Sequence, residues 1–341
     1  MLRRGALVLL PVLVLPLAIP AAAQPAADFY RGKTITMATG TSPGGDYDLR
    51  LRMVARHIGK YIPGSPNITV INMPGGGGLV VANWLANIAP KDGTAVVAVT
   101  QNLAVHQATG AAGIKFHVRE FNWIGNTTDT PNVITAWHAT GIRTIQDVME
   151  RELVVGATGR ASGSFLYPYS LNQLVGTKFK IVTGYPGGND VNIAMERGEV
   201  GGRGSNSWAA WKSTRPQWVA EKKIFNLVQV ALRRNAELAD VPTLMELAKN
   251  DEDRQVLAFI SADTAISRPL TTNAGVPADR VEALRRAFTA TMKDPAFLAE
   301  AAKTETDISP MTGEEVQKIA VATINTPPQV LKRAHALIEG K

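Results

Sequence analysis

Short apolar runs alternate with glycine-rich turns and with helically spaced apolar residues along most of the chain. Residues 34–38 predict a strand, residues 39–46 a loop, and a helix is expected to begin near Tyr47. A second unit opens with a strand at 68–72, and its helical pattern ends before Pro90. This alternation is typical of an α/β fold in which helices flank mainly parallel sheets.

The same pattern restarts after residue 126, which predicts a second lobe. We expect residues 24–126 to form the first lobe, residues 127–228 the second, and residues 229–341 to return to the first lobe and add C-terminal helices. The strand predicted at 225–232 is expected to return with them. A chain of 341 residues exceeds what one hydrophobic core usually serves. Two lobes joined by a double crossover, which would act as a hinge, are therefore predicted.

The N-terminus has the features of an export signal. Arg3 and Arg4 precede an uncharged apolar run at 6–19, and small residues follow up to Ala23. Prolines interrupt the run, which is shorter than the ~20 apolar residues that a membrane span needs. We expect a signal peptide at 1–23, cleavage after Ala23 and a periplasmic mature protein.

Composition excludes several classes of function. The chain contains no cysteine, which rules out a disulfide framework, a thiolate metal site and a cysteine nucleophile. The formal charge is +7, but the basic residues are scattered, so nucleic acid is not an expected partner. The five histidines show no metal-ligand spacing, and the glycines at 75–78 fit neither a dinucleotide fingerprint nor a P-loop. Neither a metal nor a cofactor is expected.

Four glycine-rich loops follow predicted strands, at 40–45, 75–78, 156–163 and 184–188. Ligands collect at such positions in open α/β sheets, because backbone N–H groups and helix N-termini can cradle an anion there. A tight turn is the alternative reading for any single loop. Among the basic residues, Arg160 and Arg203 lie in or beside glycine-rich segments, so either could grip a carboxylate or could be an exposed loop arginine.

One of these loops also matches a hydrolase motif. Residues 40–44 read G-T-S-P-G, the G-x-S-x-G pattern that holds a nucleophilic serine between a strand and a helix. In that motif the residue after the serine donates its backbone N–H to the oxyanion hole, and Pro43 has none. We expect a binding protein rather than an enzyme, and an exported α/β hydrolase using Ser42 is the alternative.

An ordered series of motifs resembles the substrate-binding proteins of tripartite tricarboxylate transporters, the Bordetella uptake gene family. The series covers nearly the whole mature chain. Its members are Tyr30-Arg31-Gly32-Lys33-Thr34-Ile35, Pro43-Gly44-Gly45 with Asp48, the segments 72–78, 89–94, 156–159, 162–164 and 185–188, and Ala239-Asp240-Val241-Pro242-Thr243.

The resemblance implies a periplasmic-binding-protein fold, type II-like, whose two lobes close on a small carboxylate or amino-acid-like ligand. It also implies delivery to a membrane permease of two subunits, and such proteins usually work as monomers. A ligand-sensing subunit for a membrane receptor would share the same residues and is a further alternative. The residues expected to bind the ligand are Ser42, Gly44, Gly45, Asp46, Tyr47, Asp48, Thr158, Arg160, Ser162, Ser164, Tyr185, Ser205 and Asn206.

The sequence departs from the family pattern inside these loops. Asp46 and Tyr47 stand where relatives usually have glycine and a small hydroxyl residue, Arg160 replaces a small polar residue, Phe165 a frequent histidine and Ser205 a frequent aspartate. Asp46 is expected to narrow and acidify the site. It could receive an amine, Arg160 could replace a water-mediated contact, or the two side chains could pair across the closed cleft.

Overall fold

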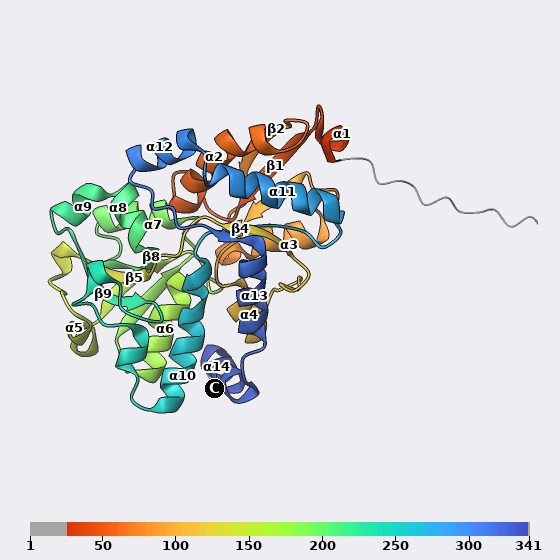
Figure 1. The fold of residues 1–341 in the computed structure, drawn as a ribbon. Coiled ribbons are helices and arrows are strands. Elements are labelled where there is room, and N and C mark those ends of the chain that lie inside the picture. Colours follow the sequence, from red (N-terminus) through yellow and green to blue (C-terminus); the bar gives the residue numbers. More distant parts are fainter. Residues whose placement is uncertain (1–25, 340–341) are drawn as a thin grey trace, which may run out of the picture.

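The computed structural model describes residues 26–339, so the predicted signal peptide and its cleavage site lie outside the described residues (Figure 1). Two separate sheets organise the chain into two lobes with helices packed around each of them. The predicted two-lobed α/β architecture is therefore confirmed.

The first lobe is built on a six-stranded sheet with the order β11-β4-β10-β3-β1-β2. Its three parallel strands are β1, β2 and β3, and β10 runs antiparallel between β3 and β4. The strands are β1 (Thr34–Thr39), β2 (Asn67–Asn72), β3 (Ala95–Ala98), β4 (Asn122–Asn126), β10 (Pro269–Thr272) and β11 (Met311–Thr312). Strand β10 begins with proline, which lacks a donor but is tolerated at the first position of a strand.

The second lobe is built on a five-stranded sheet with the order β7-β6-β8-β5-β9. Strand β6 runs parallel to β7 and β8, while β5 runs antiparallel to β8 and β9. The strands are β5 (Asn132–Trp137), β6 (Leu153–Ala157), β7 (Phe179–Thr183), β8 (Gly202–Ser207) and β9 (Ile224–Val230).

Helices complete both lobes. Those around the first sheet are α1 (Ala26–Tyr30), α2 (Asp46–Ile58), α3 (Leu79–Asn87), α4 (Leu103–Ala108), α11 (Ala278–Thr291), α12 (Pro295–Lys303) and α13 (Gly313–Ile324). Those of the second lobe are α5 (Ile145–Glu150), α6 (Gly163–Leu174), α7 (Gly188–Glu196), α8 (Trp208–Thr214), α9 (Pro216–Ala220) and α10 (Asp251–Ser261). The last helix, α14 (Pro328–Glu339), lies beside α10 (Figure 1).

The return to the first lobe occurs later than the sequence suggests. Strand β9 pairs with β5 in the second sheet, although it was expected to return to the first. Helix α10 follows it into the second core, where Val256, Leu257 and Ile260 pack with Tyr167. The first lobe resumes only at β10, so the prediction that it resumes at residue 229 is wrong. Apolar residues on β9 and α10 fit either core, and only strand pairing decides between them.

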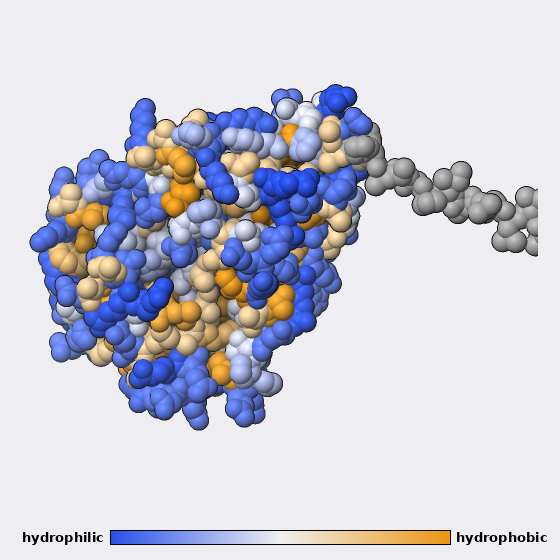
Figure 2. Space-filling view, in the orientation of Figure 1, coloured by the Kyte–Doolittle hydropathy of each residue, from blue (hydrophilic) through white to orange (hydrophobic). Residues whose placement is uncertain are grey.

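The distribution of apolar residues on the surface and along the helices bears on whether the chain contains a membrane-spanning segment. On the face drawn in Figure 2, apolar residues form separate small patches within a largely hydrophilic surface. None of the helices within residues 26–339 is both long enough and apolar enough to cross a bilayer.

Candidate functional site

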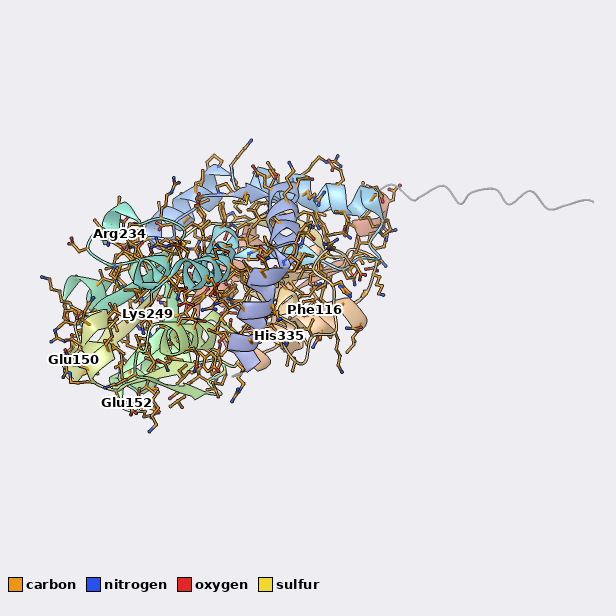
Figure 3. All side chains as sticks on the ribbon, turned by 90° about the horizontal axis from the view of Figure 1, so that it is seen from below. Phe116, Glu150, Glu152, Arg234, Lys249 and His335 are labelled. Atoms are coloured by element: carbon orange, nitrogen blue, oxygen red, sulfur yellow. The ribbon has the colours of Figure 1, made fainter. Side chains whose placement is uncertain are left out.

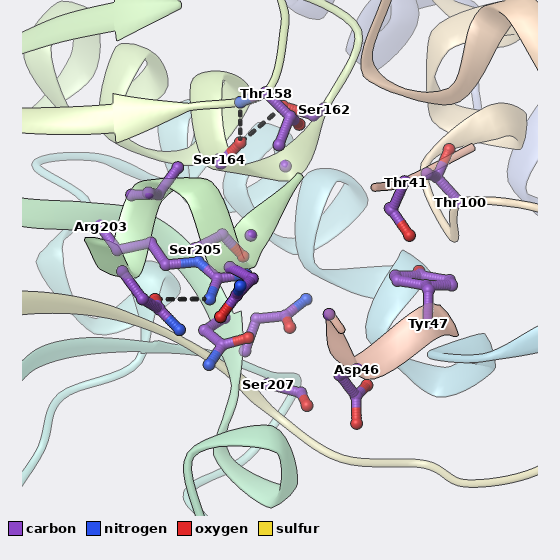
Figure 4. A pocket seen from close by; sticks show the side chains of 18 of the residues that line it. Thr41, Asp46, Tyr47, Thr100, Thr158, Ser162, Ser164, Arg203, Ser205 and Ser207 are labelled. Carbon is purple, nitrogen blue, oxygen red and sulfur yellow. Dashed lines mark hydrogen bonds between the residues drawn. The ribbon is translucent and has the colours of Figure 1, made fainter. Parts of the chain in front are cut away.

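A pocket lies between the two lobes, where loops after several strands meet strand β8 (Figure 4). The first lobe contributes the loop after β1, the start of α2, the segment after β3 and Arg268, while the second contributes the starts of α6 and α7 and one side of β8. The side chains that line the pocket are polar except for Val191, and the polar ones are Thr41, Asp46, Tyr47, Thr100, Gln101, Asn102, Asn132, Thr158, Ser162, Ser164, Asn189, Asn192, Arg203, Ser205, Asn206, Ser207, Thr214 and Arg268. Such a lining suits a small, strongly polar ligand.

The lobes touch each other at the mouth of the pocket. The Ser42 hydroxyl donates to Asp190 Oδ2 at 2.5 Å, and the Ser42 amide donates to the Pro186 carbonyl at 3.3 Å. The contact is so close that a Cβ at Gly187 would lie 2.9 Å from the Ser42 nitrogen. Only glycine lets the two loops approach in this way.

A second contact joins the lobes through another pair of loops. A Cβ at Gly77 would lie 2.7 Å from the Ala161 carbonyl carbon, and a Cβ at Gly159 would lie 2.7 Å from the Gly77 nitrogen. Main chain therefore meets main chain at both places. The structure shows the lobes in a closed arrangement.

Three helices begin at the pocket wall with their N-termini unoccupied by side-chain caps. The N-cap residues of α2, α6 and α7 are Gly45, Ser162 and Gly187, and none of them bonds to its own helix through a side chain. By contrast, α5, α8, α10, α12 and α13 each begin with a capping side chain. The first N–H groups of a helix have no partner within it and carry partial positive charge, so these three termini favour an anion.

On the wall formed by the first lobe, Asp46 is fully engaged with cations. Arg50 Nε donates to Asp46 Oδ1 at 2.9 Å, and Arg268 Nε donates to Asp46 Oδ2 at 2.5 Å. These side chains are only 4 to 7% exposed. Burial alone would raise the pKa of Asp46, but the two guanidiniums lower it to about 2. The cluster carries two positive charges against one negative charge, so Asp46 does not acidify the pocket as expected.

On the opposite wall, Arg203 has no ionic partner. Its Nη1 donates to the side-chain oxygen of Asn192 at 3.0 Å, and its guanidinium lies 5.4 Å from the centre of the Trp211 ring. Within residues 26–339 no carboxylate lies within salt-bridge distance of it. Burial lowers the pKa of Arg203 to about 9, and the neighbouring Arg268 adds to this effect. A partly buried cation that lacks an ionic partner is stabilised by an anion.

Further polar groups lack partners at the same pocket. Asn206 is 5% exposed, and its amide nitrogen has no hydrogen-bond partner within the described residues. The hydroxyls of Thr41 and Thr100 on the other wall are also buried and unpartnered. Buried polar groups are normally satisfied, so these three atoms are candidates for ligand contacts. Figure 4 shows Thr41 and Thr100 facing Arg203 across the pocket.

The sequence matches a known family. The family model described as "Tripartite tricarboxylate transporter family receptor" matches residues 51–336, which is most of the chain. The chain belongs to this family. The receptor is also 23% identical, over 93% of its length and 91% of the relative's, to the UPF0065 protein in the gbd 5' region of Cupriavidus necator.

Solved structures agree with the fold of the receptor. MatC from Rhodopseudomonas palustris with bound malate has a TM-score of 0.68 at 17% identity, with 90% of this chain and 99% of that chain covered. Rpa4515 from R. palustris with adipate has a TM-score of 0.67 at 17% identity, with 89% of this chain and 97% of that chain covered. At these identities the likeness shows the fold.

Behind two of the side chains that line the receptor's pocket lies a buried carboxyl, Asp263, which has hydrogen bonds but no salt bridge among residues 26–339. Tyr167 donates to Asp263 at 2.9 Å, and the amides of Gln101 and Asn102 donate to it as well. Burial raises the pKa of Asp263 to about 7, although these donors oppose the shift. Because Gln101 and Asn102 also line the pocket, Asp263 fixes the orientation of two lining side chains.

The structure brings most of the predicted binding residues to the pocket. Those that line it are Gly44, Gly45, Asp46, Tyr47, Thr158, Ser162, Ser164, Ser205 and Asn206. Direct contact of these residues with a ligand stays a prediction. Most of these residues could be predicted because they belong to a strand, a glycine-rich loop and a helix N-terminus that follow one another within a short segment.

Four predicted residues lie elsewhere. Ser42 joins the lobes at the pocket mouth, and Asp48 accepts from the Gly44 amide at 2.9 Å and so shapes the loop beside the pocket. Tyr185 packs with the apolar residues of the second lobe. Arg160 is exposed and lies 5.4 Å from the Phe165 ring centre. Arg160 does not pair with Asp46, whose two oxygens accept from other arginines.

Sequence reasoning also missed residues that the pocket contains. Arg268 lies more than 200 positions from the Asp46 carboxylate that it contacts, so no local pattern connects them. Arg203 was not among the residues expected to bind the ligand, and the sequence left open whether it is an exposed loop arginine, but it lies on the central strand β8 and lines the pocket. That strand reads Gly-Arg-Gly-Ser-Asn-Ser, which has no β-branched or aromatic residue. Its glycines are needed because a Cβ at Gly204 would lie 1.9 Å from the Ser164 carbonyl oxygen.

Proposed function

We propose that this receptor captures a small organic anion through a carboxylate group, in the periplasm, and delivers it to a two-subunit tripartite tricarboxylate-type permease. The observation that carries the proposal is Arg203, a guanidinium without an ionic partner among residues 26–339, in a pocket where three helices begin. A planar guanidinium can bind a carboxylate with two parallel hydrogen bonds.

The family and the occupied relatives support this proposal. Malate and adipate, the ligands of the two R. palustris structures, are both small carboxylates. An amino acid is a poorer candidate for this pocket, because Asp46 already accepts from Arg50 and Arg268 and so offers no free carboxylate to an ammonium group. We therefore narrow the expected ligand to a carboxylate without an amine.

We assign the ligand contacts to two walls. On the first lobe they are the backbone of Gly44, Gly45 and Asp46 and the side chains of Thr41, Tyr47 and Thr100, and on the second lobe they are Thr158, Ser162, Ser164, Arg203, Ser205 and Asn206. The hydrolase alternative is not favoured, because the Ser42 hydroxyl donates to Asp190 and, among residues 26–339, does not donate to a histidine that could act as its base. We expect the receptor to act as a monomer, which is supported by a pocket to which both lobes of one chain contribute lining residues.

A thermal-shift screen tests the proposal. The mature chain from Gln24 is mixed with mono-, di- and tricarboxylates and with amino acids, and hits are measured by calorimetry. A ligand at 100 times its Kd should add about 2.7 kcal/mol to the free energy of unfolding. Replacing Arg203→Gln should weaken carboxylate binding about 10- to 100-fold, because a hydrogen bond to a charged group contributes about 1.5–3 kcal/mol.

Arg254→Gln is the matched control, because Arg254 is an exposed arginine on α10 away from the pocket. It should bind like the wild type. Stabilisation by amino acids and not by carboxylates would contradict the proposal, as would unchanged carboxylate affinity in the Arg203→Gln variant.

A further inference from the structure

We propose that Arg203 and Arg268 make closure of the cleft depend on a bound anion. The two arginines belong to different lobes: Arg203 lies on β8 of the second sheet, and Arg268 directly precedes β10 of the first. Both line the pocket. Figure 4 shows Arg203 on one wall and, on the facing wall, Asp46 and Tyr47, the residues that Arg268 contacts.

The charges on the two walls do not cancel. On the first lobe, Arg50 and Arg268 share one carboxylate, Asp46, so one positive charge remains. On the second lobe, the one hydrogen bond of the Arg203 side chain among residues 26–339 is to the neutral Asn192. The pocket thus brings together two walls that both carry net positive charge.

The other charged groups near the pocket leave this balance positive, because the charge of Arg215 offsets that of Asp190 on the second lobe. Asp190 accepts from Ser42 at the mouth, and Asp263 accepts from Tyr167 at the back. Neither is hydrogen-bonded to Arg203 or to Arg268 within residues 26–339. Arg215 adds another guanidinium nearby, bonded to the Asn189 side chain at 2.7 Å.

Closure changes how strongly the two walls repel each other. In an open cleft, water and salt separate and screen the two positive walls. When the lobes meet at Ser42 and Gly187 and at Gly77 and Gly159, the walls approach and much of that water leaves. A negatively charged group between Arg203 and Arg268 replaces repulsion by attraction to both lobes. Because a ligand shifts an equilibrium by its differential affinity for the two states, this anion would favour the closed state.

Arg203 would therefore favour negatively charged ligands through two separate effects. It binds the anion, and without an anion it opposes the closed form. A neutral analogue of the ligand would then fail to close the cleft even if it filled the pocket. This inference rests on the proposed function for the identity of the anion, but the effect of Arg203 on closure can be measured without any ligand.

The test measures the separation of the lobes. The chain has no cysteine, so spin labels at Ile88→Cys and Glu152→Cys report only on these sites. Ile88 directly follows α3 on the first lobe and is 75% exposed, and Glu152 projects from the outer surface of the second lobe (Figure 3). Distance distributions are recorded by pulsed electron resonance without ligand and with malate or adipate at 10 mM as probes.

Without ligand, the wild type should be mainly open, and Arg203→Gln should raise its closed-to-open ratio by about tenfold or more. Raising the salt concentration should increase closure of the wild type and leave Arg203→Gln unchanged, because salt screens the repulsion. Arg254→Gln should behave like the wild type. Gly187→Ala should stay open under all conditions, because the added Cβ meets Ser42 and blocks closure whatever the charge.

An open population in Arg203→Gln equal to that of the wild type would overturn the inference. Calorimetry on the same samples separates this failure from failure of the proposed function. If a carboxylate binds the wild type and Arg203→Gln does not change closure, the function stands and the charge-dependent closure is wrong. If no carboxylate binds and Arg203→Gln still closes, the function is wrong and the repulsion between the walls stands.

Discussion

The two walls of the pocket handle buried charge in opposite ways. In the first lobe, Asp46 accepts from two guanidiniums, so the protein supplies both signs of charge. In the second lobe, Arg203 has an asparagine as its hydrogen-bond partner and no carboxylate within salt-bridge distance among residues 26–339. A charge that the protein balances serves the structure of the free receptor, while a charge that it leaves unbalanced is available to a ligand.

The largest effect should come from exchanging the charges on the two walls for neutral groups. Asp46→Asn leaves Arg50 and Arg268 buried without their carboxylate and should lower the free energy of unfolding by about 3–5 kcal/mol. Arg203→Gln removes a charge that has no ionic partner and should change stability by less than about 1 kcal/mol, or increase it. Urea denaturation without ligand measures both. Equal losses would show that the walls do not differ.

A smaller effect is expected from Asp263, the carboxyl that both lobes surround. Burial raises the pKa of Asp263 to about 7 in the folded protein, above the ordinary value of 3.8. Its contribution to stability is therefore fully present below about pH 4 and is lost as the pH rises through 7. For wild type relative to Asp263→Asn, stability should fall by at most about 1.4 kcal/mol per pH unit between pH 4 and 7.

Melting curves of both proteins at half-unit steps from pH 4.5 to 8.5 give this difference. Groups shared by the two proteins cancel, including His106, whose pKa burial lowers to about 4. The difference should be constant above pH 7.5. A constant difference over the whole range would contradict the raised pKa of Asp263.

The smallest effect should come from Arg160. This arginine is exposed and lies near the Phe165 ring rather than in the pocket. We expect Arg160→Ala to change carboxylate affinity less than twofold in calorimetry, and to the same extent for mono- and dicarboxylates. A loss comparable to that of Arg203→Gln would mean that Arg160 turns inward when a ligand binds.

The contrast between these two arginines shows what a sequence can predict for this fold. The loops that follow β1 and β6 were recognisable because a strand, glycines and a helix start succeed one another within about ten residues. Arg160 and Arg203 both sit beside glycines, so local pattern could not rank them. Arg203 is only partly exposed and lies at the pocket because β8 is the central strand, with Gly202 opposite Val155 on β6 and Ala136 on β5. Nothing in the composition of that strand predicts this pairing.

The same limit applies to charge. Asp46 was expected to make the site acidic, because the chain around it does not reveal Arg268. The tertiary fold brings that arginine to Asp46 and reverses the sign of the wall. The prediction that β9 and α10 return to the first lobe failed for a related reason, since their apolar residues suit either core.

The glycine contacts between the lobes do not involve the side chains that would recognise the ligand. The shape of the closed receptor can therefore stay the same while its ligand changes during evolution. Gly77 and Gly159 bring the main chains of the two lobes together, and Gly187 lies against Ser42. Main-chain atoms do not change when a neighbouring side chain mutates. A lineage of such receptors can therefore exchange the polar residues of β8 and α2 to take new cargo. Throughout those exchanges, the outline of the closed molecule that a transporter meets would be inherited unchanged.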